Sequence, residues 1–141
     1  MRGATRVLGR LSDISDGWEN VMAGEPSVQT NTSGTSLLVH VSGEMDYETA
    51  PFFRDHLLDV IAGGQRRVVL DLSAVSFCDS SGLSVLLGAW QQVTGSGAVL
   101  VLARVPPRVQ RMLQVTGVDA VLHMYGTLAE AEGEQAAGSG A

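Results

Sequence analysis

The residues most able to do chemistry are four consecutive ones, Asp79-Ser80-Ser81-Gly82. An apolar run that ends in Asp71 comes shortly before them, and a helix-like apolar pattern follows them at once. Two hydroxyl groups and a carboxylate are therefore predicted to lie where a buried strand passes into a helix. A hydroxyl in such a place can cap the helix, accept a phosphoryl group or act as a nucleophile.

Two explanations of this cluster are open from the residues alone. In the first, Asp79 and Ser80 only cap the helix, because their side-chain oxygens accept hydrogen bonds from N–H groups of its first turn, and Gly82 allows close backbone packing. In the second, Ser81 accepts a phosphoryl group, because a helix N-terminus favours negative charge. That group adds roughly −1.5 to −2 charges, and the neighbouring Asp79 sharpens the change that a partner meets.

A hydrolase would need Ser80 or Ser81 as nucleophile and a histidine as base. The sequence lacks the Gly-x-Ser-x-Gly turn that exposes such a serine in many hydrolases. The three histidines are predicted to lie mid-strand, within a helix and in the last strand, where packed or surface roles are common. They are His40, His56 and His123. The sequence therefore predicts a protein that is not an enzyme.

The elements that must position the cluster alternate between strand and helix. Alternating or continuous apolar runs predict the strands, and apolar residues at helical spacing with Pro, Thr and Gly at the ends predict the helices. The predicted order is strands at 27–33 and 35–43, a helix from Thr49 to 62, a strand at 66–72, a helix at 81–97, a strand at 98–105, a helix at 106–117, a strand within 118–126 and a short helix from Thr127.

This order predicts the α/β class, with a single mixed, mostly parallel sheet of four to five strands and about four helices. The first two strands form an antiparallel pair, and the helices are expected mainly on one side. By length the chain is one domain. Residues 1–26 are predicted to be a flexible arm, 27–130 the folded domain, and 131–141 a disordered tail rich in Gly, Ala and Ser.

Composition restricts the partners and the compartment. The net charge of −6 makes nucleic acid and anionic membrane surfaces poor partners. No apolar run approaches the about 18 residues that a membrane span needs. The single cysteine, Cys78, allows no internal disulfide and no Cys/His metal site, and it is expected to be buried and unreactive. We therefore expect a soluble, cytoplasmic protein without a metal or a cofactor.

Two stretches resemble the signature of the STAS domain, and in particular of the bacterial anti-sigma factor antagonists. One is "VVLDLSAVSFCDSSGLSVLLGAW", residues 68–90, in which a strand, an aromatic residue and Asp-Ser-Ser-Gly-Leu open a helix. The other is "VSGEMDYETAPFFRDHL", residues 41–57, with Gly-Glu, an apolar residue and Asp before Thr-Ala. The resemblance covers about residues 27–130.

The resemblance implies a partner switch. The antagonist binds an anti-sigma factor that is also a GHKL-type serine kinase, and this binding frees the sigma factor. The kinase then phosphorylates the second serine of the motif, here Ser81, and the complex separates. A PPM-type serine phosphatase restores the binding form. ATP and Mg²⁺ would belong to the kinase, so no cofactor is implied for this chain.

The second helix is predicted to have one apolar and one uncharged face. The apolar stripe is Leu83, Leu86, Leu87 and Trp90. The uncharged face suits close protein contact, although simple solvent exposure also explains it. The predicted partner-binding residues are Ser84, Gly88, Gln91 and Gln92 on this face and, by the resemblance, Asp46, Tyr47 and Glu48 in the loop before the first helix. The alternative within the same fold is a non-switching scaffold or adaptor, such as a stressosome component or a subunit of a lipid-transport complex.

Overall fold

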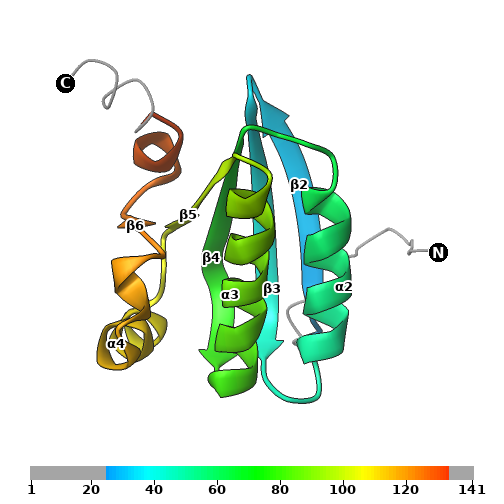
Figure 1. The fold of residues 1–141 in the computed structure, drawn as a ribbon. Helices are drawn as coiled ribbons and strands as arrows, with labels where there is room; N and C mark the ends of the chain where they lie inside the picture. Colours follow the sequence, from blue (N-terminus) through cyan, green and yellow to red (C-terminus); the bar gives the residue numbers. More distant parts are fainter. Residues whose placement is uncertain (1–24, 134–141) are drawn as a thin grey trace, which may run out of the picture.

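The structure, a computed structural model, describes residues 25–133 (Figure 1). Strands and helices alternate along this part of the chain, and a last helical segment covers residues 128–133. The elements are β2 (Ser27–Ser33), β3 (Ser36–Met45), α2 (Ala50–Ile61), β4 (Arg67–Cys78), α3 (Ser80–Gly95), β5 (Val99–Ala103), α4 (Pro107–Thr116), the 3₁₀ turn η1 (Val118–Ala120) and β6 (Met124–Tyr125).

The strands form one five-stranded sheet in the order β2-β3-β4-β5-β6. β2 runs antiparallel to β3, and the other neighbouring strands are parallel. The predicted α/β class and the mixed, mostly parallel sheet are therefore confirmed. The spatial order of the strands is also their order along the chain.

This sequential order explains why the helices gather on one face of the sheet. Crossovers between parallel strands are right-handed, so three crossovers that step in one direction leave their helices on the same side. Figure 1 shows α2 and α3 side by side in front of the sheet. Between these helices and the strands lies the main core. Its largest fully buried side chains include Phe53, Met45, Leu57, Leu70, Leu72, Leu86, Leu102 and Leu113.

The helical segment at 128–133 covers part of the opposite face of the sheet. Ala131 is fully buried there and packs in one cluster with Leu38, Val69 and Val101. The Nη1 atom of Arg67 also donates a hydrogen bond of 3.2 Å to the Ala131 carbonyl. The folded domain therefore continues past the predicted boundary at residue 130. The rest of the predicted arm and tail, residues 1–24 and 134–141, lies outside the described residues.

Two predicted strands differ in length from those of the structure. β4 continues to Cys78, whereas the predicted strand ended at residue 72. Bulges opposite β3 let the strand continue while its exposed and buried residues no longer alternate. The strand predicted within 118–126 is reduced to Met124–Tyr125, because a left-handed Gly117 and a 3₁₀ turn occupy the residues before it.

The first turn of α3 lies in unusually close contact with β3. A Cβ atom added at Gly82 would lie 2.5 Å from the Met45 carbonyl oxygen and 2.8 Å from the Cys78 sulfur. The Asp79 N–H donates a 3.1 Å hydrogen bond to the same Met45 carbonyl. Only glycine at position 82 therefore lets the helix begin so close to the strand.

We expect Gly82→Ala to lower the free energy of unfolding by about 1–3 kcal/mol, because the added methyl group forces backbone apart. Gly88→Ala is the matched control, since Gly88 lies in the same helix with open space around its Cα. That change should raise the free energy of unfolding by roughly 0.5–1 kcal/mol. Urea unfolding measures both. Equal effects of the two substitutions would contradict the close contact.

Candidate functional site

The start of α3 and the loop after β3 lie at one edge of the sheet. Met45 and Cys78 are partners in the parallel register of β3 and β4, so the segments that follow these two residues leave the sheet together. Both segments lie at the lower edge in Figure 1, where the arrows of β3 and β4 end. The structure thus brings the predicted loop residues 46–48 to the same edge as the polar cluster 79–82.

Asp79 is the N-cap of α3. Its Oδ1 atom accepts hydrogen bonds from the N–H groups of Ser81, at 2.8 Å, and Gly82, at 3.1 Å. Ser80, for which a capping role was also open, is instead the first helical residue and is exposed. The Asp79 carboxylate alone caps the helix, whereas the sequence had left a capping role open for both Asp79 and Ser80.

The hydroxyl group of Ser81 is uncommitted within the part of the chain that the structure describes. Ser81 is half-buried, and its N–H bonds to Asp79, but no residue from 25 to 133 hydrogen-bonds its Oγ atom. No described histidine hydrogen-bonds Ser80 or Ser81. His40 bonds to Asp71, and His56 bonds to a backbone carbonyl. Among residues 25–133, the arrangement therefore supplies a free hydroxyl at a helix N-terminus with no histidine bonded to it.

Cys78 lies directly beneath this turn. It is 7% exposed, and its sulfur lies so close to Gly82 that it would clash with any side chain at that position. Burial, and then the negative charge of Asp79, raises the pKa of its thiol to about 11. The thiol therefore stays protonated at neutral pH, and the predicted burial is confirmed.

The loop between β3 and α2 is built by Asp46. Its Oδ1 atom accepts hydrogen bonds of 3.0 Å from the N–H groups of Glu48 and Thr49, and the Thr49 hydroxyl donates to the Glu44 carbonyl at 2.6 Å. This network leaves Tyr47 80% exposed at the tip of the loop. Asp46 thus shapes the loop, and Tyr47 and Glu48 are its exposed side chains.

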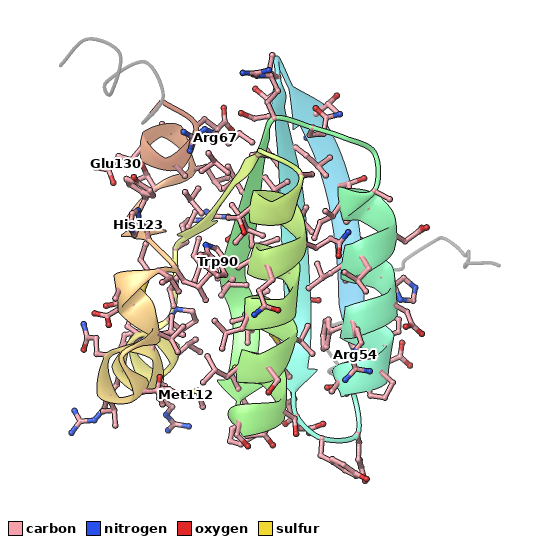
Figure 2. All side chains as sticks on the ribbon, in the orientation of Figure 1. Arg54, Arg67, Trp90, Met112, His123 and Glu130 are labelled. Carbon is pink, nitrogen blue, oxygen red and sulfur yellow. The ribbon has the colours of Figure 1, made fainter. Side chains whose placement is uncertain are left out.

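The two faces of α3 divide nearly as the sequence predicts. Val85, Leu86, Ala89 and Val93 are buried, whereas Leu83, Leu87 and Trp90 are only partly buried. Figure 2 shows Trp90 on the side of α3 toward β5 and α4. The predicted uncharged face is exposed at every position, Ser84, Gly88, Gln91 and Gln92. Its role as a partner surface stays a prediction.

Phe77 is an exposed residue at this edge that the sequence analysis missed. It is 44% exposed and pairs in register with Glu44 at the end of β3. Strict alternation after the buried Val75 would turn Phe77 inward, but the irregular register around Ser76 turns it outward. The sequence therefore shows an aromatic residue beside the polar cluster, but it does not show that this side chain points outward.

The charges at the edge are all negative. Segments 44–49 and 76–84 hold Glu44, Asp46, Glu48 and Asp79 and no lysine or arginine. Within residues 25–133, no group of three or more His, Cys, Asp or Glu side chains is arranged to hold a metal ion. The edge therefore presents an uncharged helix face next to an acidic rim, which suits a basic protein surface.

Asp79→Ala should lower the free energy of unfolding by about 1 kcal/mol, because two N–H groups lose their acceptor. Ser80→Ala is the comparison and should change it by less than about 0.5 kcal/mol, since the exposed hydroxyl makes no described contact. Chemical unfolding followed by circular dichroism distinguishes the two. A larger loss for Ser80→Ala than for Asp79→Ala would show that Asp79 is not the main cap of the helix.

Cys78 should react slowly with a thiol reagent in the native protein, because its thiolate form is scarce and its sulfur is buried. Labelling with a chromogenic disulfide at pH 8 measures the rate. The same protein in denaturant is the control and should react at least about a hundred times faster, since native labelling then requires opening of the structure. Comparable rates in both conditions would contradict the burial of Cys78.

Comparison with known proteins agrees with this architecture. A family model described as "STAS domain" matches residues 27–131. An anti-sigma F factor antagonist from Paenibacillus polymyxa is 33% identical over 90 residues, which are 63% of this chain and 77% of that protein. An anti-sigma-B factor antagonist from Staphylococcus aureus is 28% identical over 98 residues, 70% of this chain and 91% of that protein.

Among solved structures, an anti-sigma factor antagonist from Mycobacterium paratuberculosis matches with a TM-score of 0.70 and 28% identity. The match covers 77% of this chain and 92% of that one. The family match spans the whole sheet and the helices that position the cluster at 79–82. The chain therefore belongs to the STAS-domain family, and the relatives it resembles within that family are anti-sigma factor antagonists.

Proposed function

We propose that this protein is an anti-sigma factor antagonist that is switched off by phosphorylation of Ser81. In its binding form it holds an anti-sigma factor with GHKL-type serine kinase activity, and a sigma factor is released. The names of the relatives support the antagonist role. The observation that carries the switch is the free Ser81 hydroxyl at the N-terminus of α3, on an edge shared with the exposed loop at 46–48.

The Asp79 cap gives phosphorylation a direct electrostatic effect. A phosphoryl group at a helix N-terminus normally binds the free N–H groups of the first turn. Here the N–H groups of Ser81 and Gly82 already donate to Asp79. A phosphate on Ser81 therefore meets an occupied cap and a like charge, so its roughly −1.5 to −2 charges are directed outward, toward the partner.

The partner surface in this proposal combines α3 and the β3–α2 loop. The uncharged face of α3 can be buried at low desolvation cost, because no ionised group there must lose its water. Tyr47 and Phe77 supply exposed aromatic area, which often contributes most to binding at interfaces. Glu44 and Glu48 supply acidic groups at the rim, which fit basic residues of the kinase.

The other components of the switch lie on other proteins. The kinase binds ATP and Mg²⁺ and transfers the γ-phosphoryl group to the Ser81 oxygen, which loses its proton. A PPM-type phosphatase hydrolyses the phosphoserine and restores the binding form. This chain contributes the hydroxyl, the cap beside it and the docking surface.

The test is phosphorylation by candidate anti-sigma kinases of the source organism, with the site mapped by mass spectrometry. Wild type and Ser80→Ala should take phosphate on Ser81, and Ser81→Ala should take none while it still binds the kinase. Phosphate on Ser80 alone would overturn the assignment. Binding to an anti-sigma factor without any transfer would favour a non-switching scaffold.

Ser81→Glu should weaken kinase binding by about thirty- to a hundred-fold, because a fixed charge beside Asp79 must be desolvated in the interface at a cost of about 2–3 kcal/mol. Thr94→Glu is the matched control, since it adds the same charge at the exposed far end of α3. Surface-bound kinase and biolayer interferometry measure both affinities. The switch is refuted if a folded Ser81→Glu protein binds as tightly as Thr94→Glu.

A further inference from the structure

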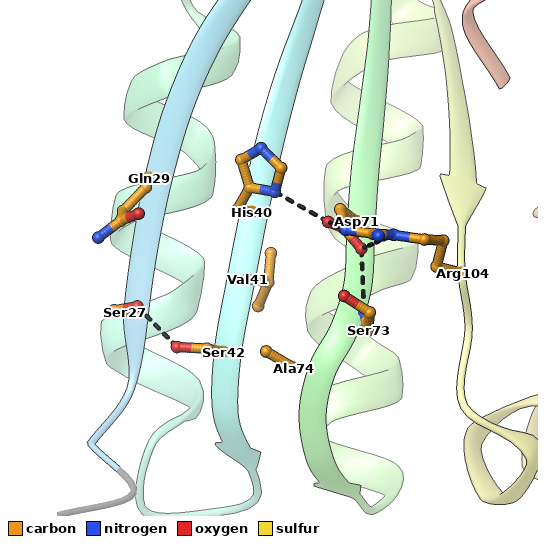
Figure 3. Close-up of a pocket in the computed structure, with 9 residues that line it drawn as sticks. All are labelled: Ser27, Gln29, His40, Val41, Ser42, Asp71, Ser73, Ala74 and Arg104. Carbon is orange, nitrogen blue, oxygen red and sulfur yellow. Dashed lines mark hydrogen bonds and ion pairs between the residues drawn. The ribbon is translucent and has the colours of Figure 1, made fainter. Parts of the chain in front are cut away.

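The sheet face opposite α2 and α3 carries a polar hollow of about 410 Å³ (Figure 3). The helical segment at 128–133 covers the other part of this face, where it packs on apolar residues of β3, β4 and β5. The hollow lies over the middle of the strands β3 and β4. Its polar lining includes Ser27, Gln29, His40, Asp71, Ser73 and Arg104.

Asp71 is the buried centre of the hollow. Its side chain is 3% exposed, and both carboxylate oxygens accept hydrogen bonds. Arg104 donates to Asp71 from Nε at 3.3 Å and from Nη2 at 2.6 Å, His40 donates from Nδ1 at 2.8 Å, and the Ser73 N–H donates at 3.0 Å. Although burial raises the pKa of Asp71, these hydrogen bonds outweigh it and lower the pKa to about 2. The carboxylate is ionised and fully used.

Arg104 reaches Asp71 from a strained position. Its φ angle is 53°, and it is the only residue other than glycine with positive φ among residues 25–133. Such a conformation costs a residue with a Cβ atom free energy and persists where other contacts compensate it. Here the Arg104 N–H donates to the Tyr125 carbonyl, and the side chain folds over the sheet to Asp71. Figure 3 shows Arg104 and His40 approaching Asp71 from opposite sides.

This pairing leaves donors that face no acceptor. A guanidinium group has two edges that can each bind an oxyanion with two parallel N–H bonds. Asp71 takes the edge formed by Nε and Nη2. The second edge, formed by Nη1 and the other N–H of Nη2, has no partner among the described residues, and the Arg104 side chain is 44% exposed. His40 is held by Nδ1, so Nε2 on the far side of its ring is also unpaired there.

We propose that this hollow, the open-face site, binds a small ligand through an oxyanion group that pairs with the free edge of Arg104. The amide group of Gln29 lines the same hollow and supplies a further donor. A cation finds no free carboxylate there, because Asp71 is saturated. Most of the lining side chains are polar, which favours a ligand with polar groups over a purely apolar one. The site is separate from the docking edge of α3 and goes beyond the switch.

Among the described residues, no charged group beside the hollow opposes an anion there. The Asp71 carboxylate is offset by Arg104, which keeps its second edge free. The residues that face His40 from β2 are uncharged. Glu130 and Glu132 of the last helical segment bond to the Gly126 N–H and the Ser33 hydroxyl and do not line the hollow.

The test is a titration of the ¹⁵N-labelled full chain with sulfate, which stays dianionic from pH 5.5 to 8, followed by NMR. Sodium chloride at equal ionic strength is the control. We expect saturable shifts confined to the residues that line the hollow. A parallel titration with acetate separates a tetrahedral ligand group from a planar carboxylate by which anion saturates first.

Two variants test the assigned side chains. Arg104→Lys keeps the charge near Asp71 but loses the second edge, so it should weaken sulfate binding at least fivefold. His40→Asn keeps a donor toward Asp71 and should leave sulfate binding largely unchanged, because the anion pairs with Arg104, and the control His56→Asn, on α2, should change nothing. Shifts that match those of chloride, that centre on other residues, or that survive Arg104→Lys unchanged would overturn the proposal. Saturable shifts that do not respond to Arg104→Lys would indicate an adventitious ion only.

Discussion

The approach of α3 to β3 at Gly82 is the contact on which the arrangement of the site depends. Because no side chain separates the first turn of the helix from the Met45 carbonyl, the helix begins directly at the end of the strand. The Asp79 N–H then bonds to that same carbonyl, which fixes the direction in which the turn leaves the sheet. The position of Ser81 relative to the neighbouring loop follows from this single backbone contact rather than from any contact of its own side chain.

The Asp79 carboxylate has two effects that are hard to separate in a sequence. It satisfies the first N–H groups of α3, and it places a negative charge next to Ser81. The first effect stabilises the unmodified form of the helix. The second effect repels any further negative charge at Ser81, so that such a charge is directed toward the surface. One residue therefore stabilises the start of the helix and, in the proposed switch, increases the electrostatic effect of a phosphoryl group.

The order and type of nearly all elements could be predicted from the sequence, because hydrophobic period, Pro and Gly positions mark them locally. The edge shared by the cluster and the β3–α2 loop also followed, since parallel strands end together. The bulged end of β4 could not be predicted, because a bulge turns Phe77 outward without any change in residue type. The same holds for the partners of Asp71. His40 and Arg104 lie 31 and 33 residues away in sequence, and only the register of three strands brings them together.

The sequential order of the strands has a consequence for how the domain folds. Each strand pairs with the strand just before it in the chain, so every pairing closes a loop no longer than one crossover, and the entropy lost in closing it is small. Assembly can therefore proceed along the chain, one strand and helix at a time, although each parallel pairing forms more slowly than the β2–β3 hairpin. The segment at 128–133 is different, because Glu132 bonds to Ser33 across 99 residues. It can dock only on a sheet that has already formed. Its docking then joins the last helical segment to the first strand, β2.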